Sequence, residues 1–113
     1  MIYEKIKSIF NRNRDSKGKD IDFAEMKNML KNYKKCILLD VRSLQEYKEG
    51  HLNNSINIPL FELSKKVSKI ITNKDDMIIV YCQTGSRSRR AVSILTKLGY
   101  KDLYNLKGGL DSN

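Results

Sequence analysis

Apolar residues along this chain alternate between short continuous runs and helical spacing. The two strongest runs, 36–41 and 77–81, are typical of strands buried on both faces, and shorter strand candidates lie at 55–58 and 103–106. Apolar residues at helical intervals separate these runs and predict helices over residues 22–34, 43–50, 61–71 and 86–98. This alternation predicts an α/β domain with a mainly parallel sheet.

Local signals define the ends of some of these elements. Ser43 and Glu46 fit a capping box at the start of a short helix, which Gly50 then ends. Residues 1–19 differ from the rest, because a short amphipathic segment over 1–10 leads into a polar stretch that has no periodicity. We therefore expect an N-terminal segment and linker over residues 1–19 and a single domain over residues 20–113.

The cysteine at position 82 lies directly after the run 77–81 and directly before a predicted helix. At such a strand-to-helix turn, backbone N–H groups converge and the helix dipole is positive, which favours a thiolate over a thiol. Gly85 lets the backbone turn tightly there. The loop therefore predicts a cysteine nucleophile in an anion-binding cradle, whose oxyanion hydrogen bonds can come from the hydroxyls of Thr84, Ser86 and Ser88.

Strand direction predicts which residues lie near this loop. Parallel strands end at the same edge of a sheet, where ligands of open α/β sheets bind, so Asp40 and Arg42 should lie close to Cys82. Cys36 begins its strand, and the offset puts it more than about 13 Å from Cys82 at ~3.3 Å per residue. We therefore expect no disulfide between them and interpret Cys36 as a small core residue.

Composition narrows the class of protein. The 113 residues are 40% hydrophobic and 31% charged, and no apolar run approaches the ~18 residues that span a bilayer. The net charge of +9 favours anionic partners, but no aromatic-interleaved basic stripe accompanies it, so we do not expect nucleic-acid binding. The N-terminus lacks the pattern of a secretory signal, and we expect a cytoplasmic protein with reduced cysteines.

Several motifs, in unbroken order over about residues 20–110, resemble a single-domain rhodanese, a sulfurtransferase. They are Asp40-Val41-Arg42, Glu46-Tyr47, Gly50-His51-Leu52, Asn57-Ile58-Pro59, Cys82-x-x-Gly85-x-Arg87-Ser88 and Gly108-Gly109. The resemblance implies a rhodanese-like α/β fold, in which helices flank both faces of a central, mainly parallel five-stranded sheet. The chain departs from the usual family pattern in having no tryptophan after Gly108-Gly109.

The resemblance also implies the chemistry. Cys82 would carry a sulfane sulfur as a persulfide, cradled by the main-chain amides from Gln83 to Ser88, while Arg87 helps to bind an anionic donor such as thiosulfate. The acceptor would be cyanide, a thiol or a sulfur-carrying protein, and no metal or organic cofactor is needed. Asp40 and Arg42 are expected to support the site through charge-assisted hydrogen bonds.

Two other functions use the same residues. A cysteine phosphatase has Cys-x5-Arg, whereas Arg87 gives Cys-x4-Arg here and position 88 is serine, so this loop is one residue shorter. A rhodanese-like domain can also serve as a non-catalytic module for protein binding, although domains used in that way lack the cysteine that is present here. Detection of one sulfur atom added to Cys82 separates sulfur transfer from both alternatives.

Overall fold

The computed structural model describes residues 18–112 of the chain. The elements in chain order are β1 (Lys19–Ile21), α2 (Phe23–Asn32), β2 (Cys36–Asp40), α3 (Leu44–Glu49), β3 (Ile56–Asn57), η1 (Leu60–Glu62), α4 (Leu63–Ile70), β4 (Met77–Tyr81), α5 (Ser86–Lys97), β5 (Asp102–Leu106) and η2 (Gly109–Ser112). The N-terminal segment expected over 1–10 and most of the expected linker lie outside the described residues.

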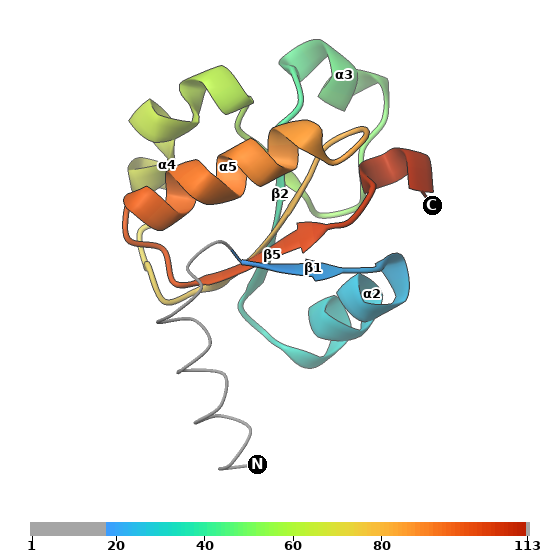
Figure 1. The fold of residues 1–113 in the computed structure, drawn as a ribbon, viewed down its shortest axis with the longest axis horizontal. Coiled ribbons are helices and arrows are strands. Elements are labelled where there is room, and N and C mark those ends of the chain that lie inside the picture. Colours follow the sequence, from blue (N-terminus) through green and yellow to red (C-terminus); the bar gives the residue numbers. More distant parts are fainter. Residues whose placement is uncertain (1–17, 113) are drawn as a thin grey trace.

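The five strands form one sheet in the order β1-β5-β4-β2-β3, and every described pairing is parallel. Asp40 pairs with Tyr81 in register, so β2 and β4 end together at one edge of the sheet. The predicted α/β class and the predicted common edge are therefore both confirmed. Figure 1 shows α4 and α5 on one side of this sheet and α2 on the other.

Alternation along the central strands divides the core into two layers. Ile78 and Val80 of β4 pack beneath α4 and α5, together with Cys82. Ile79 and Tyr81 face the opposite side, where α2 contributes Met26. Because each successive side chain points to the other face, a continuous apolar run is the pattern that a strand covered on both faces requires.

Two helices begin with the same reciprocal cap. The Ser43 hydroxyl accepts from the Glu46 amide at 3.1 Å, and the Glu46 carboxylate accepts from the Ser43 amide at 3.0 Å, as the sequence predicted. Asp22 and Glu25 make the equivalent pair of bonds at the start of α2. Such caps satisfy amides that have no partner inside the helix, and they set where each helix starts.

The structure corrects the predicted boundaries in two places. Lys19 begins strand β1 rather than ending a linker, because its segment pairs with Tyr104 to Leu106 of β5. A strand of three residues, two of them polar, is too short to show an alternation of apolar and polar side chains, so only its pairing with β5 identifies β1. The helix predicted over 61–71 is divided, since a 3₁₀ turn over Leu60–Glu62 precedes α4. Among the described residues, no helix is both long and apolar enough to cross a membrane.

Candidate active site at the Cys82 loop

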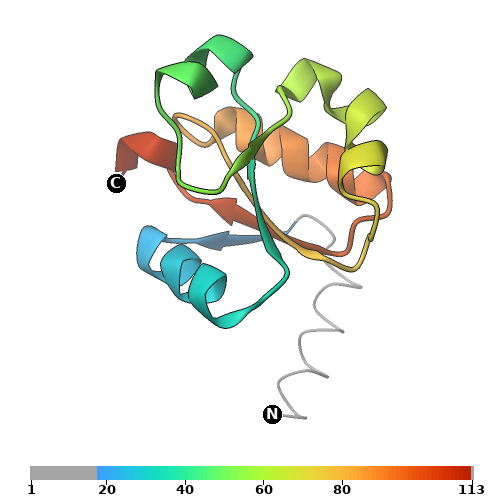
Figure 2. The same cartoon turned by 180° about the vertical axis from the view of Figure 1, so that it is seen from behind.

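The candidate site is the loop that joins β4 to α5 at the carboxyl edge of the sheet. In Figure 2 this loop lies between α3 and the carboxyl-terminal turn. Gly85 is the N-cap residue of α5 and has φ of 102°. A Cβ atom at this position would lie 3.2 Å from the backbone nitrogen of Gly108, so both the backbone conformation and the space favour glycine.

Backbone amides of the loop converge on the Cys82 sulfur. The Gly85 amide lies 3.0 Å from Sγ and the Ser88 amide 3.3 Å from it, and both donate to the sulfur. The Cys82 residue is itself fully buried. The sulfur therefore lies at the base of a ring of N–H groups at the start of α5, where the helix dipole also favours negative charge.

These contacts decide the acidity of the thiol. Burial acts to raise the pKa of Cys82, but the Ser88 hydroxyl and the amides of Ser88, Gly85 and Thr84 outweigh it, and the pKa is lowered from its ordinary value of 9.0. Hydrogen bonds to the charged form are what shift a buried thiol in this direction. The thiolate is thus favoured at neutral pH relative to an ordinary cysteine.

A polar network leads from the sulfur to the sheet. The Ser88 hydroxyl lies 3.6 Å from Sγ, 3.0 Å from the Gly85 carbonyl oxygen and 2.5 Å from Oδ1 of Asn105. The Asn105 amide nitrogen donates to Asp20 at 3.0 Å, which orients Oδ1 toward Ser88. Asn105 was not among the predicted site residues, because a single polar residue within an apolar strand is its only signal in the sequence.

Asp40 and Arg42 form a buried ion pair beside the loop. The guanidinium group of Arg42 donates to both carboxylate oxygens of Asp40 at 2.9–3.1 Å, and the Arg42 amide adds a bond of 2.8 Å. Arg42 also donates to the Gly50 carbonyl at 2.6 Å and to the Gln83 side chain at 3.3 Å. One buried guanidinium group therefore ties the end of β2 to the end of α3 and to the cysteine loop.

The remaining loop side chains point away from the sulfur or to solvent. The Gln83 amide group lies between Arg42 and Asp111, to which it donates at 2.6 Å. Thr84 and Ser86 are exposed. Of the hydroxyl groups predicted to serve the cradle, only that of Ser88 is bonded to the cysteine in the described structure.

Arg87 is paired with a carboxylate from another element. Its two terminal nitrogens lie 2.7 and 3.0 Å from the two oxygens of Glu46 in α3, and they donate to them. This pairing lowers the pKa of Glu46 to about 2, with a further contribution from the Ser43 amide. The same carboxylate thus caps α3 and orients the arginine of the loop, and only the cap was predicted from the sequence.

The carboxyl-terminal turn η2 supports the loop from behind. The amide of Leu110 donates to the Cys82 carbonyl at 3.0 Å, and the amide of Asp111 donates to the Gln83 carbonyl at 2.9 Å. A Cβ atom on Gly109 would lie 2.4 Å from the Cys82 carbonyl oxygen, closer than such atoms approach. Glycine at this position therefore permits the close contact between η2 and the loop.

Within residues 18–112, no cluster of three or more His, Cys, Asp or Glu side chains is arranged to hold a metal ion. The chemistry that this part of the chain offers is that of a buried thiolate ringed by N–H donors, with cationic side chains next to it. Such an arrangement can stabilise negative charge on a sulfur atom and on an anion that approaches it.

A family model described as Rhodanese-like domain matches residues 22–112. The chain belongs to the rhodanese-like domain family. The crystal structure of a rhodanese-related protein from Thermoplasma volcanium matches this rhodanese-like chain with a TM-score of 0.71 and 36% identity. That match covers 83% of this chain and 88% of that chain.

The curated relatives of this rhodanese-like chain are named for different activities. The thiosulfate sulfurtransferase PspE of Escherichia coli is 36% identical over 70 residues, which cover 62% of this chain and 67% of that protein. A tRNA uridine(34) hydroxylase of Buchnera aphidicola is 33% identical over 99 residues, which cover 82% of this chain and 31% of that protein. The chain spans between 28% and 71% of the length of the curated relatives described by these comparisons.

Proposed function

We propose that this protein is a sulfurtransferase that moves a sulfane sulfur from thiosulfate or a persulfide donor to a thiophilic acceptor through a persulfide on Cys82. The observation on which this proposal mainly rests is the buried sulfur of Cys82, which accepts from two backbone amides at 3.0 and 3.3 Å and has a lowered pKa. The name of the E. coli relative supports the same reaction.

The first half of the reaction is a displacement at sulfur. The Cys82 thiolate attacks the outer sulfur of thiosulfate, a new S–S bond forms, and the bond to the sulfonate group breaks with its electron pair leaving on sulfite. The negative charge then lies on the outer sulfur of the persulfide. We expect the N–H groups at the start of α5 to stabilise that charge, because two of them already donate to the adjacent Sγ.

The second half returns the enzyme to its starting state. A nucleophile such as cyanide or a thiolate attacks the outer sulfur, the S–S bond breaks, and its electron pair returns to the Cys82 sulfur as a thiolate. Cyanide takes up the sulfur to become thiocyanate, and a thiolate takes it up to become a persulfide. Because the enzyme carries the sulfur between two separate substrates, we expect ping-pong kinetics.

The loop residues have distinct roles in this proposal. The amides of residues 83–88 and the Ser88 hydroxyl hold the sulfur, while Arg87 attracts the anionic donor. Two of the five N–H groups of the Arg87 guanidinium bond to Glu46, so other N–H groups remain to meet the donor. Asp40 and Arg42 hold the loop in place through Gln83. Since thiols are acceptors and both cysteines are free, we propose a reducing compartment such as the cytoplasm.

Intact-mass measurement tests this function directly. After incubation with thiosulfate and removal of the excess, we expect a mass increase of one sulfur atom in the wild type and in Cys36→Ser, and none in Cys82→Ser. Cyanide should then remove the added sulfur and yield one equivalent of thiocyanate. A wild-type protein that gains no sulfur from thiosulfate or from a persulfide would indicate a non-catalytic binding module instead.

A cysteine phosphatase is tested in the same preparation. Hydrolysis of a generic aryl phosphate that disappears in Cys82→Ser would overturn the assignment to sulfur transfer. We expect no such hydrolysis, because the Cys-x4-Arg loop is one residue shorter than the Cys-x5-Arg loop of cysteine phosphatases.

A further inference from the structure

An open pocket lies next to the cysteine loop, between α3, η1, α4 and α5. Its volume is 460 Å³, and it is lined by Val41, Ser43, Pro59, Leu60, Phe61, Ser64, Arg87, Arg90 and Ile94. This is far more room than an inorganic sulfur anion needs, so the proposed reaction with thiosulfate does not account for it.

The pocket is connected to the nucleophile through two of its lining residues. Val41 forms the floor and is buried in the same core layer as Cys82, and its amide donates to the carbonyl of Tyr81, the residue before the cysteine. Arg87 lines the pocket and precedes Ser88, whose amide donates to the Cys82 sulfur. Arg87 is thus the residue that the pocket shares with the cysteine loop.

The lining combines an apolar surface with positive charge. Phe61 on the rim is 80% exposed, which is unusual for a phenylalanine, and Pro59, Leu60 and Ile94 continue the apolar surface. Arg87 and Arg90 lie one turn apart on the same face of α5, and no carboxylate lines the pocket among the described residues.

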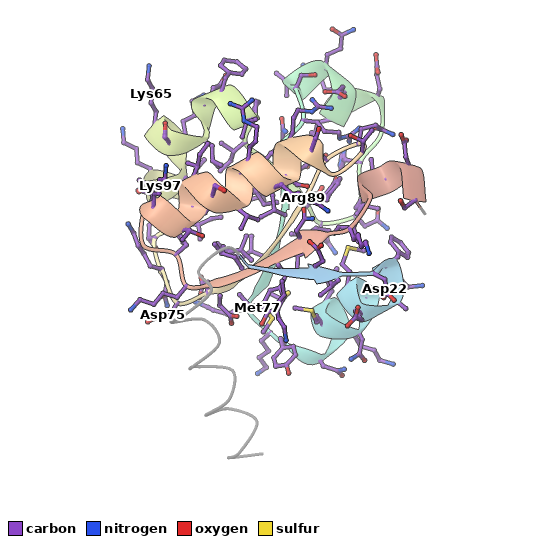
Figure 3. All side chains as sticks on the ribbon, in the orientation of Figure 1. Asp22, Lys65, Asp75, Met77, Arg89 and Lys97 are labelled. Carbon is purple, nitrogen blue, oxygen red and sulfur yellow. The ribbon has the colours of Figure 1, made fainter. Side chains whose placement is uncertain are left out.

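The two arginines differ in their partners within the described structure. Arg87 already donates to both oxygens of Glu46, whereas Arg90 is exposed and makes no ion pair with another described residue. Arg89, its neighbour in sequence, lies instead 3.7 Å from Asp20 of β1 and is absent from the pocket lining. Figure 3 labels Arg89 near the amino end of α5.

We propose that this pocket binds the organic part of a thiol acceptor that carries an apolar group and a carboxylate. The inference rests on the sulfur transfer proposed above. The apolar part of the thiol packs against Phe61, Pro59 and Ile94, its carboxylate pairs with Arg90, and its sulfur faces the Cys82 persulfide. Charge complementarity selects this occupant, because an uncharged thiol leaves Arg90 unpaired and an inorganic anion leaves the apolar lining uncovered.

The step in this pocket is balanced and reversible. The thiolate of the ligand attacks the outer sulfur of the Cys82 persulfide, an S–S bond forms to the ligand, and the Cys82–sulfur bond breaks to regenerate the Cys82 thiolate. In the reverse direction, the persulfide of the same organic compound donates its sulfur to Cys82. One pocket therefore serves an organic thiol as an acceptor and its persulfide as a donor.

Three acceptors distinguish the parts of the pocket. Cyanide has no organic part, para-thiocresol has an aromatic ring without a carboxylate, and para-mercaptobenzoate has both. The full chain is loaded with thiosulfate, and the rate of sulfur loss from Cys82 is measured by intact mass for each acceptor. Dividing the rate of each variant by that of the wild type removes the intrinsic reactivity of the three nucleophiles.

Two substitutions and one matched control complete the test. We expect Arg90→Gln to slow transfer to para-mercaptobenzoate by about fivefold and to leave the other two acceptors unchanged. Phe61→Ala should slow both aromatic thiols by about fivefold and leave cyanide unchanged. Arg89→Gln removes the same charge from the adjacent position, which does not line the pocket, and should not slow para-mercaptobenzoate more than the other two acceptors.

The outcomes separate this proposal from the proposed function. If the loaded wild type yields no thiocyanate with cyanide, the sulfur transfer itself is wrong. If thiocyanate forms but neither aromatic thiol accepts sulfur, the pocket does not bind such acceptors. An equal effect of Arg90→Gln and Arg89→Gln, or an equal effect of Arg90→Gln on both aromatic thiols, would also overturn the assignment of Arg90 to the carboxylate.

Discussion

Cys82 and Cys36 have the same side chain in opposite electrostatic settings. The Cys82 sulfur accepts hydrogen bonds from Ser88 and Gly85, which outweigh burial and lower its pKa. Burial and the nearby charge of Asp102 raise the pKa of Cys36 to about 11. Cys36 has no comparable ring of amides, so its thiol stays protonated at neutral pH. The difference in reactivity therefore comes from the donors around each sulfur and not from exposure, since Cys82 is the more buried of the two.

Removal of the Ser88 hydroxyl tests this explanation at a single residue. We expect Ser88→Ala to raise the pKa of Cys82, because the contact with the Ser88 hydroxyl lowers that pKa and burial, which raises it, stays the same. The pH at which persulfide formation from thiosulfate is half-maximal should move upward, and the rate at neutral pH should fall by about tenfold.

Ser93→Ala is the matched control, since Ser93 is an exposed serine of the same helix. Its pH profile should coincide with that of the wild type. If Ser88→Ala lowers the rate equally at all pH values, the hydroxyl acts through the shape of the loop and not through the acidity of Cys82.

At the scale of elements, Glu46 connects α3 to α5. It closes the capping box of α3 and accepts from both terminal nitrogens of Arg87. The bidentate geometry fixes the direction of the guanidinium group, and the cap fixes the start of α3. The position of the arginine next to the cysteine loop therefore depends on a helix that begins about forty residues earlier in the chain.

This link predicts a pH dependence of stability. The pKa of Glu46 is lowered to about 2 in the folded protein from an ordinary value of 4.5. Its contribution to the free energy of unfolding is therefore fully present above about pH 4.5 and is lost as the pH falls toward about 2. Because both side chains are about one-third exposed, we expect Glu46→Gln to cost only about 1 kcal/mol at neutral pH.

Urea unfolding of the wild type and Glu46→Gln at several pH values measures this contribution. The difference between them should shrink as the pH is lowered from about 4.5, because the wild type loses the charge that the variant never has. Glu49→Gln removes a carboxylate from the same helix without touching Arg87 and should not show this trend. A constant difference between wild type and Glu46→Gln across the range would contradict the prediction.

At the scale of the whole molecule, the sheet separates the two cysteines. Cys36 pairs with Met77 at the start of β4, and Cys82 follows the end of that strand, so about 16 Å of strand lies between their positions at ~3.3 Å per residue. They also pack in different core layers on opposite faces of the sheet. A disulfide needs Cα atoms within about 7 Å, so the folded chain cannot form one between them.

Oxidation of the folded protein checks this separation. After treatment with diamide we expect no intramolecular disulfide by intact mass, and Cys36→Ser should form the Cys82 persulfide at the wild-type rate to within about twofold. The control is the same treatment in urea, where the unfolded chain can bring the two thiols together. A bridge formed under native conditions would mean that the sheet opens readily.

The local pattern of the sequence was enough to predict much of this molecule. The continuous runs at 36–41 and 77–81 predicted the two central strands, because a strand covered on both faces excludes water along its whole length. Ser43 and Glu46 predicted the start of α3, because a cap involves residues only three apart. The same reasoning placed Cys82 between a strand and a helix and Asp40 and Arg42 at the same edge.

Contacts between distant segments were decided only by the tertiary structure. Four such contacts join residues that are far apart in the chain. They are the pairing of β1 with β5, the bond from Ser88 to Asn105, the pairing of Arg87 with Glu46 and the bond from Leu110 to the cysteine loop. The periodicity of apolar residues indicates whether a side chain is buried, but it does not indicate which strand or helix lies beside that side chain. Strand order and helix placement determine these neighbours, and they bring Asn105, Glu46 and the carboxyl-terminal turn to the cysteine loop that the sequence identified.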